Sequence, residues 1–444
     1  MPKALPGIEK RVTSARHGLA GTDVERVVQY LEDGAATLAL VRLCRLACEE
    51  ESGLMRLGRW EQAPAMEPEF VKKRLDNERW PDIRELESHP LDWLRGLDEY
   101  VHRHTRFHRT VSLTDGDARF HLIRHVHPHS YPSYRDRQRG NLQYHLRHHR
   151  FVPCALHGHP VALQAVSDVC EQATAAILQR QRLVVAVARF DDGVTEEINW
   201  NHGNGHFHMT GLSDALTRRR SIEAALDFAR QHHADLLVFP ELTIPADLRD
   251  DIRDDLQARA SSVGKESDAS ALPALIALGS FHEQDATHQH LNRALLVDRF
   301  GDVLLTADKR AKVTIAHQGR DWGEALQVAP TPCSLLPLDI GLLALAICKD
   351  VFDGPVSRQL QDVGLDWLLA PSMTDHLGPH RTNTGNLLRA HGTVSIVANQ
   401  PMPGCTRSGD AFPCGYVDRP DGPTECANLL TLVEIPLSIR LDQA

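Results

Sequence analysis

The chain has 444 residues, of which 42% are hydrophobic and 24% charged, as in ordinary globular proteins of two or three domains. No apolar run approaches the roughly 18 residues that cross a membrane, and the opening MPKALPGIEKRVTS lacks the apolar core of a signal peptide, so we expect a cytoplasmic protein. Nine irregularly spaced cysteines favour reduced thiols over a disulfide framework. The net charge of −10 argues against nucleic-acid affinity of the chain as a whole.

The first part of the chain, residues 1–180, is predicted to be mainly helical and rich in His and Arg, with an unknown role. Apolar residues in TDVERVVQYLEDG, residues 22–34, recur at the spacing of one helix face. The segment PVALQAVSDVCEQATAAILQRQR, residues 160–182, predicts a further helix that ends near Arg182. We therefore predict a separate N-terminal region that ends at residue 180.

A basic, histidine-rich stretch lies inside this region. Residues 101–150 hold ten Arg, no Lys and three Asp, and residues 101–160 hold twelve of the 26 histidines. His125, His127 and His129 alternate, so on a strand they would share one face. Three tyrosines accompany the arginines: Tyr131, Tyr134 and Tyr144. Three interpretations stay open for this stretch: a metal site, a contact with nucleic acid or nucleotide, and a solvated or dimer-facing surface. The spacing of its residues matches no zinc motif.

From residue 181 to residue 444 the pattern is that of an α/β domain. The run RLVVAVARF predicts a strand, and residues 213–235 predict a helix. Further apolar runs, among them LLVF, ALIALGSF, GLLALAI, WLLAPS and VSIVAN, alternate with loops and with the helix PVSRQLQDVG. This alternation predicts helices packed on a largely buried sheet. The insertion at residues 191–212 would form either a lid or a surface loop.

Three predicted strands of this domain end at residues with reactive side chains. Glu241 follows LLVFP, Lys309 follows GDVLLTAD, and Cys348 follows GLLALAI. Each residue alone has an ordinary structural explanation, such as a helix-end partner, a solvated lysine or a core thiol. Ligand sites of α/β folds, however, gather at the carboxyl ends of strands. We therefore expect the three side chains to meet in one site.

Together these groups are able to transfer an acyl group from an amide. A thiol has a reference pKa of about 8.5 and needs a base or a cation to act as a nucleophile at neutral pH. Glu241 would serve as the general base that takes the proton from Cys348 and delivers it to the leaving amine. The Lys309 ammonium would favour the thiolate and stabilise the oxyanion. The backbone N–H of Lys349 would share that task, a donor typically worth about 3 kcal/mol.

The same segments resemble the nitrilase, or carbon–nitrogen hydrolase, superfamily. LLVFPEL, GDVLLTADK and LALAICKDVFDGPVSRQL are similar to its three signature segments, and the resemblance covers about Arg182 to Ala444. The family's glutamate, lysine and cysteine match Glu241, Lys309 and Cys348. The family commonly places an orienting glutamate between its lysine and its cysteine, and Glu324 is the only glutamate in that interval.

The resemblance implies a four-layer αββα sandwich and a homodimer or higher homo-oligomer, without a metal or an organic cofactor. It also implies a small-molecule substrate whose C–N bond is cleaved, as an amide or a carbamoyl compound more often than as a nitrile. We therefore expect an amidase-like hydrolase that works through a thioester on Cys348. The alternative, from another class, is a binding or regulatory protein that keeps the fold after its chemistry has lapsed and works through its N-terminal region, in contact with nucleic acid or nucleotide.

Some positions depart from the family pattern. Ala307 and Asp308 replace the customary aromatic residue and arginine before the lysine, and Lys312 is a nearby rival for the lysine role. Lys349 stands where an aromatic residue often follows the nucleophile. Its charge suggests either a negatively charged substrate or a partner carboxylate such as Asp350.

Overall fold

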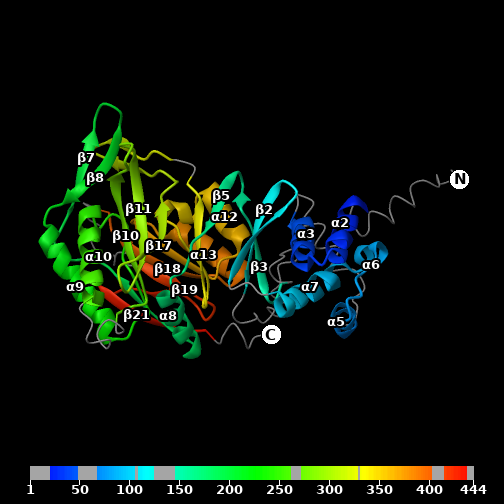
Figure 1. Ribbon diagram of the computed structural model, residues 1–444. Helices are drawn as coiled ribbons and strands as arrows, with labels where there is room; N and C mark the ends of the chain where they lie inside the picture. Colours follow the sequence, from blue (N-terminus) through cyan, green and yellow to red (C-terminus); the bar gives the residue numbers. More distant parts are fainter. Residues whose placement is uncertain are drawn as a thin grey trace. The chain divides into compact units, whose positions relative to one another are not determined.

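The computed structural model describes residues 21–48, 68–105, 109–124, 146–261, 272–328, 331–402 and 415–437. The chain forms two compact units that divide between Cys154 and Ala155 (Figure 1). Within the described ranges, no helix is long and apolar enough to cross a membrane. Nor do these ranges hold a group of three or more His, Cys, Asp or Glu side chains placed to bind a metal ion.

The first unit combines helices with a small antiparallel sheet. Its helices are α2 (Gly21–Glu32), α3 (Ala36–Cys48), α5 (Pro68–Asp76), α6 (Ile83–Ser88) and α7 (Pro90–His104). Its sheet has the order β1 (Thr110–Asp115), β2 (Ala118–Arg124) and β3 (His149–Pro153). The helix expected at residues 22–34 is α2, and its apolar face packs into one core with Trp93 of α7 and Phe151 of β3. The described part is therefore helical with a sheet that the sequence pattern did not predict.

Polar contacts between side chains connect the helices of this unit to its sheet. Asp115 is fully buried where β1 ends, and its carboxylate accepts a hydrogen bond from Arg42 of α3 at 2.9 Å. Asp98 of α7 faces the His149 ring at 2.8 Å. His149 of the basic stretch thus has a structural partner, because a buried polar group is costly without one. His125, His127 and His129, like the three tyrosines, lie outside the described residues, so the three interpretations of that segment remain predictions.

The second unit contains two large sheets. The six-stranded sheet has the order β12 (Val303–Asp308), β11 (His290–Asp298), β10 (Leu275–Gln284), β9 (Leu236–Val238), β6 (Arg182–Ala188) and β21 (Leu430–Pro436). The eight-stranded sheet has the order β20 (Thr424–Glu425), β19 (Gly415–Asp418), β18 (Val394–Gln400), β17 (Trp367–Met373), β16 (Gly341–Leu345), β15 (Cys333–Leu338), β5 (His159–Leu163) and β4 (Ala155–Leu156). The helices of the second unit are α8 (Asp168–Gln179), α9 (Ala215–Gln231), α10 (Ala246–Ser261), α12 (Gly354–Val363) and α13 (Gly378–His391).

The alternation of side chains along β6 shows how the layers are stacked. Val185 and its odd-numbered neighbours pack into the core between the two sheets, against β16, β17 and β18. Ala186 and its even-numbered neighbours pack on the opposite face, beneath α9 and α10. The helix α13 lies on β18 and β19 beside α12, on the far face of the eight-stranded sheet (Figure 1). The second unit is therefore the four-layer αββα sandwich that the resemblance implies.

The second unit begins earlier in the chain than the pattern predicted. Residues 159–163 form β5, which pairs in parallel with β15, and α8 begins at Asp168 with Ser167 as its cap. The helix expected at residues 160–182 is thus wrong in its first part. Cys170 and Ile177 of α8 belong to the core between the sheets. The predicted division at residue 180 therefore falls after these elements rather than before them.

The insertion at residues 191–212 is a hairpin rather than a loop. Its strands β7 (Glu196–Asn201) and β8 (His206–Leu212) join β13 (Thr314–His317) and β14 (Arg320–Glu324) in a four-stranded sheet of order β13-β14-β8-β7. Trp200 of β7 packs edge-on against Trp322 of β14, with ring centroids 5.1 Å apart. The pairing of β8 with β14 places the insertion beside the strand that carries Glu324.

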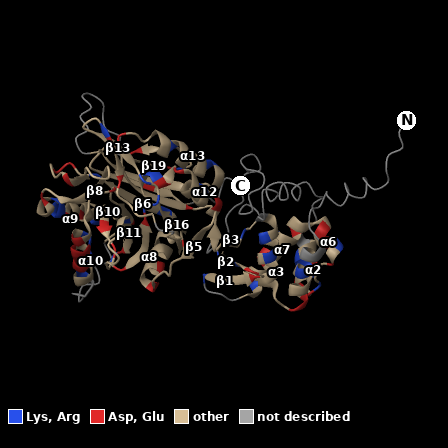
Figure 2. Cartoon of the chain, turned by 90° about the horizontal axis from the view of Figure 1, so that it is seen from above, with Lys and Arg blue, Asp and Glu red and all other residues tan. Residues whose placement is uncertain are grey.

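The helices on the outer face of the six-stranded sheet carry most of their charge toward solvent. In Figure 2 the ribbon of α10 is coloured largely for acidic residues, and its sequence ADLRDDIRDDLQARAS contains five Asp. The apolar residues Leu248, Ile252 and Leu256 recur at helical spacing and pack on the sheet. The helix is thus amphipathic in spite of its high charge.

Candidate active site

Cys348 is the first residue of the short 3-10 helix η2 (Cys348–Val351), at the sharp turn that follows β16. Its φ of 48° is in the left-handed region, which is strained for any residue but glycine. The side chain is only 4% exposed, and its sulfur lies 4.0 Å from the carbonyl oxygen of Met373. The N–H of Lys349 is in the first turn of η2, where a helix supplies no acceptor of its own. A buried thiol thus stands beside a backbone donor.

Glu241 follows β9 and is held at both carboxylate oxygens. Its Oε2 accepts the backbone N–H of Met373 at 2.9 Å. Its Oε1 accepts from the Nζ of Lys309 at 2.7 Å and from the Nδ2 of Asn292 at 2.9 Å. The residue is 1% exposed. These hydrogen-bond donors offset the free-energy cost of burying a carboxylate at the end of an apolar strand.

A glycine allows the backbone of Glu241 to reach this place. At Gly279 the strand β10 bulges, and Ser280 then forms a parallel bridge with Glu241. The φ of Gly279 is +60°, and a Cβ atom there would lie 2.2 Å from the carbonyl oxygen of Pro240. Only glycine fits so close to the chain that carries the carboxylate.

Lys309, just beyond β12, is the lysine of the site. Its Nζ lies 2.7 Å from Oε1 of Glu241 and 2.9 Å from Oε2 of Glu324. Burial alone would lower the pKa of this ammonium, but the two carboxylates outweigh burial and raise it well above its ordinary value. Lys312, the rival in the sequence, has an exposed side chain. The structure therefore brings Lys309, rather than Lys312, to Glu241.

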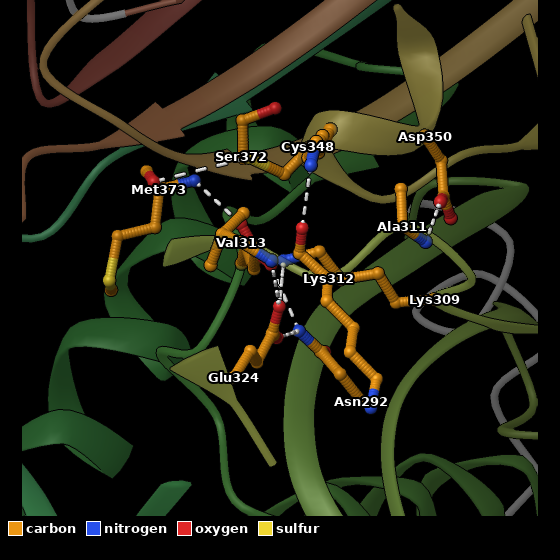
Figure 3. A network of polar contacts seen from close by, with 12 residues as sticks. Asn292, Lys309, Ala311, Lys312, Val313, Glu324, Cys348, Asp350, Ser372 and Met373 are labelled. Atoms are coloured by element: carbon orange, nitrogen blue, oxygen red, sulfur yellow. Dashed lines mark hydrogen bonds and ion pairs between the residues drawn. The ribbon is translucent and has the colours of Figure 1, made fainter. Parts of the chain in front are cut away.

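Glu324 lies at the end of β14 and has no exposed surface. Its Oε1 accepts from the Nε2 of His282 at 3.0 Å and from the Nδ2 of Asn292 at 3.1 Å. Its Oε2 accepts the backbone N–H of Val313 at 3.1 Å. Burial would raise the pKa of this carboxyl, but Lys309 and His282 hold it below its ordinary value. Figure 3 shows Asn292 and Glu324 side by side in this network.

The thiol of Cys348 is protonated in the resting site. Burial and the Glu241 carboxylate raise its pKa above the ordinary value, and the opposing effect of Lys309 is smaller. The expectation that Lys309 would favour the thiolate is thus correct in direction, but burial and Glu241 outweigh it. A thiol in this state would have to lose its proton to act as a nucleophile, which requires a base at the sulfur.

The Glu241 carboxylate and the His380 imidazole are two candidate proton acceptors near the thiol. His380 of α13 also packs near this turn, with its ring edge-on to Phe352 and its Nε2 3.3 Å from the hydroxyl of Ser372. Burial lowers the pKa of His380 to about 4, so this imidazole is a weak base. Glu241, in contrast, affects the pKa of Cys348 directly.

Lys349 and Asp350 do not pair with each other. The buried Asp350 carboxylate accepts the backbone N–H of Ala311 at 2.7 Å, as Figure 3 shows. Burial raises the pKa of Asp350 to about 7. The Nζ of Lys349 instead donates to the carbonyl oxygen of Lys312 at 2.7 Å and lies 3.9 Å from Asp353. The carboxylate suggested as a partner for Lys349 was therefore the wrong one.

The structure adds groups to the site that the sequence did not single out by role. Asn292 of β11 bridges Glu241 and Glu324, and His282 of β10 donates to Glu324. Met373 takes part through its backbone alone, which no sequence pattern reveals. Asn292 and His282 could have been noticed as polar residues inside apolar strands. The sequence does not reveal, however, which side chain each of them faces.

No family model and no curated protein matches the chain. Solved structures that are similar to it include an amidase from Nesterenkonia sp., with 19% identity and a TM-score of 0.40 over 59% of this chain and 92% of that one. A cysteine variant described as a Nesterenkonia AN1 amidase from the nitrilase superfamily has 19% identity and a TM-score of 0.39, over 59% and 94% of the two chains. A glutamate variant of that amidase, with an acetamide moiety added at its active-site cysteine, has 18% identity and a TM-score of 0.40, over 59% and 93%.

Proposed function

We propose that the protein is a thiol hydrolase that cleaves an amide or carbamoyl C–N bond of a small molecule, and a nitrile less readily. The observation that carries the proposal is the arrangement around Glu241. Its carboxylate is held by Lys309 and by the backbone of Met373, whose carbonyl faces the sulfur of Cys348. A base, a cation and a protonated thiol thus meet in a buried site, which suits nucleophilic attack on a neutral carbonyl.

In the first half of the reaction, Sγ of Cys348 forms a bond to the substrate carbonyl carbon while Glu241 takes the thiol proton. The carbonyl oxygen becomes an oxyanion, which the Lys309 ammonium and the N–H of Lys349 stabilise. The C–N bond then breaks, and Glu241 gives its proton to the departing nitrogen. Ammonia or an amine leaves, and the acyl group remains on Cys348 as a thioester.

In the second half, water attacks the thioester carbon while Glu241 takes a proton from that water. The C–S bond breaks, and the departing sulfur regains a proton from Glu241, so Cys348 returns to its protonated state. The sum is one amide and one water converted into one carboxylic acid and one amine. Glu324 takes no proton in this sequence. It keeps Lys309 charged and in place, because it supplies the second carboxylate of the ion pair.

The proposal is tested with a library of small amides and carbamoyl compounds, with ammonia release as the readout. We expect the wild type to release ammonia and the Cys348→Ala variant to release none. A matched control is Cys333→Ala, which removes a buried thiol of β15 outside the site and should leave the rate unchanged. Turnover in ¹⁸O-labelled water should place one labelled oxygen in the acid.

Ammonia release that persists in Cys348→Ala would overturn the proposed mechanism. A wild type that releases no ammonia, and forms no thioester with any member of the library, would favour the alternative of a binding protein with this fold.

Homo-oligomerisation is also part of the proposal. Light scattering on the native protein should give a mass of at least twice 49.5 kDa.

A further inference from the structure

His282 lies between the catalytic carboxylates and the inserted hairpin. It belongs to β10, is 6% exposed, and uses both ring nitrogens. Its Nε2 lies 3.0 Å from Oε1 of Glu324. Its Nδ1 lies 2.7 Å from the backbone nitrogen of Met209 on β8. The proposed reaction assigns no step to this ring.

These two contacts fix the protonation state of the ring. A backbone N–H is always a donor, so Nδ1 must present a lone pair to Met209 and carries no proton. The proton of the neutral ring is then on Nε2, where it points at the Glu324 carboxylate. A charged imidazolium would instead place an N–H at Nδ1 against the N–H of Met209, which leaves two donors facing each other. The strand β8 thus selects one tautomer of His282.

The selected tautomer suits the task of Glu324. A neutral donor gives this carboxylate a hydrogen bond without adding a positive charge beside it. Glu324 then remains an anion paired with Lys309, 2.9 Å from its Nζ. A donor at Oε1 also fixes the carboxylate in rotation, since Val313 binds Oε2 from the other side. The position of Lys309 therefore depends on His282 through Glu324.

We propose that His282, in the tautomer set by the backbone of Met209, is a positioning residue that holds Glu324 and, through it, Lys309 for catalysis. The inserted hairpin is then a permanent support of the active site rather than a lid. Two further contacts support this role of the hairpin: Ala325 donates its N–H to the carbonyl of Phe207, and β14 pairs in parallel with β8. The inference rests on the proposed function for its kinetic consequence, but not for the tautomer.

The kinetic test compares two substitutions at the same position. His282→Phe keeps an aromatic ring, slightly larger than imidazole, and removes both polar contacts, whereas His282→Gln offers an amide oxygen to Met209 and an amide N–H to Glu324. We expect His282→Phe to lower kcat about 10- to 100-fold with little change in KM, the loss that follows from removing a hydrogen bond to a charged group. His282→Gln should recover most of that loss.

The control for a general effect of hairpin histidines is His208→Phe. His208 lies on β8, and its ring contacts that of His290, with centroids 4.6 Å apart. This variant should keep the wild-type kcat. If His282 merely fills space, Phe should serve at least as well as Gln, and any loss should follow the folded fraction measured by circular dichroism. Equal kcat in the wild type and His282→Phe would overturn the inference.

The tautomer is measured by ¹H–¹⁵N NMR on protein with ¹⁵N-labelled histidine, with the His282 signals assigned by their loss in His282→Gln. We expect a protonated Nε2 and an unprotonated Nδ1 at neutral pH, because the N–H of Met209 points at Nδ1 and the Glu324 carboxylate faces Nε2. The opposite tautomer, or a charged ring at neutral pH, would overturn the inference whatever the protein hydrolyses.

A failure of the proposed function is recognised separately, by a wild type that turns over no amide. In that case the rate of alkylation of Cys348 by iodoacetamide replaces kcat. This rate reports the charges around the thiol without requiring turnover. It should change in His282→Phe and return toward the wild-type value in His282→Gln. An unchanged rate in His282→Phe contradicts the positioning role even when no substrate is known.

Discussion

The backbone N–H of Met373 donates to Oε2 of Glu241 at 2.9 Å, at the point where β17 ends. The carbonyl of the same residue lies 4.0 Å from the sulfur of Cys348. One peptide segment of the eight-stranded sheet therefore contacts both the Glu241 carboxylate, which follows a strand of the six-stranded sheet, and the Cys348 thiol, which follows β16. The effects of substitutions at Glu241 and at its neighbours follow from this arrangement.

Replacement of Glu241 by Gln should act in opposite directions on two reactions of Cys348. Amide turnover should stop, because the base is lost. Alkylation by iodoacetamide at neutral pH should become faster, because the carboxylate that helps to raise the thiol pKa is gone and Lys309 still lowers it. Each unit by which the pKa falls should give about a tenfold increase in the thiolate, followed by peptide mass spectrometry at Cys348. Slower alkylation in Glu241→Gln would contradict this account of the thiol.

The ion pair of Lys309 and Glu324 should limit the pH range of stability. Glu324 has a folded-state pKa below its reference value of 4.5, so its contribution is complete above about pH 4.5 and is lost as the pH falls through the folded-state pKa. Lys309 has a folded-state pKa above its reference value of 10.5, so its contribution is lost as the pH rises beyond that value. Urea unfolding as a function of pH measures both limits. Glu324→Gln should weaken the acid dependence, and an unchanged acid limb would contradict the prediction.

Lys309→Met should be more damaging alone than in combination with Glu324→Gln. The single variant leaves two buried carboxylates without their cation, a defect that typically costs about 3–5 kcal/mol. The double variant removes one of these charges as well, so part of the lost stability should return. Urea unfolding at neutral pH measures the difference. A double variant that is less stable than Lys309→Met would show that the carboxylates are not coupled through the lysine. Both variants should lack amide turnover.

Gly279→Ala should harm the site more than a glycine replacement elsewhere. The new Cβ would lie 2.2 Å from the carbonyl oxygen of Pro240, so the backbone of Glu241 must move. A suitable control is Gly319→Ala in the hairpin of β13 and β14, where φ is +72° and nothing lies within 4 Å of the added Cβ. The control should lose about 1–2 kcal/mol from left-handed strain alone, whereas Gly279→Ala should lose more stability and most of its turnover. Equal effects of the two replacements would argue against a role of Gly279 at Glu241.

Much of the site was predictable because its main residues follow strands that are easily recognised. Glu241, Lys309 and Cys348 each stand directly after an apolar run, and the structure brings the first two within 2.7 Å of each other. His282 was not singled out because a sequence gives no strand order. Its partner Glu324 is 42 residues away, on a strand of a different sheet.

The strands were predictable where a continuous run of apolar residues extends over the whole strand. The runs of β6, β16 and β17 are buried on both faces, so they read as continuous apolar segments. The strand β5 is half-exposed, and its sequence HPVAL begins at the end of the histidine-rich stretch, so its last four residues read as the start of the helix that follows. Its place in the sheet comes from pairing with β15, which lies more than 150 residues later in the chain.

The left-handed backbone at Cys348 implies that a single substitution at this position could raise the free energy of unfolding above that of the wild type. An alanine at this position would keep the strain, whereas a glycine would relieve it, because glycine has no Cβ to collide with the neighbouring carbonyl. Cys348→Gly should therefore melt at a higher temperature than Cys348→Ala, although neither can turn over a substrate.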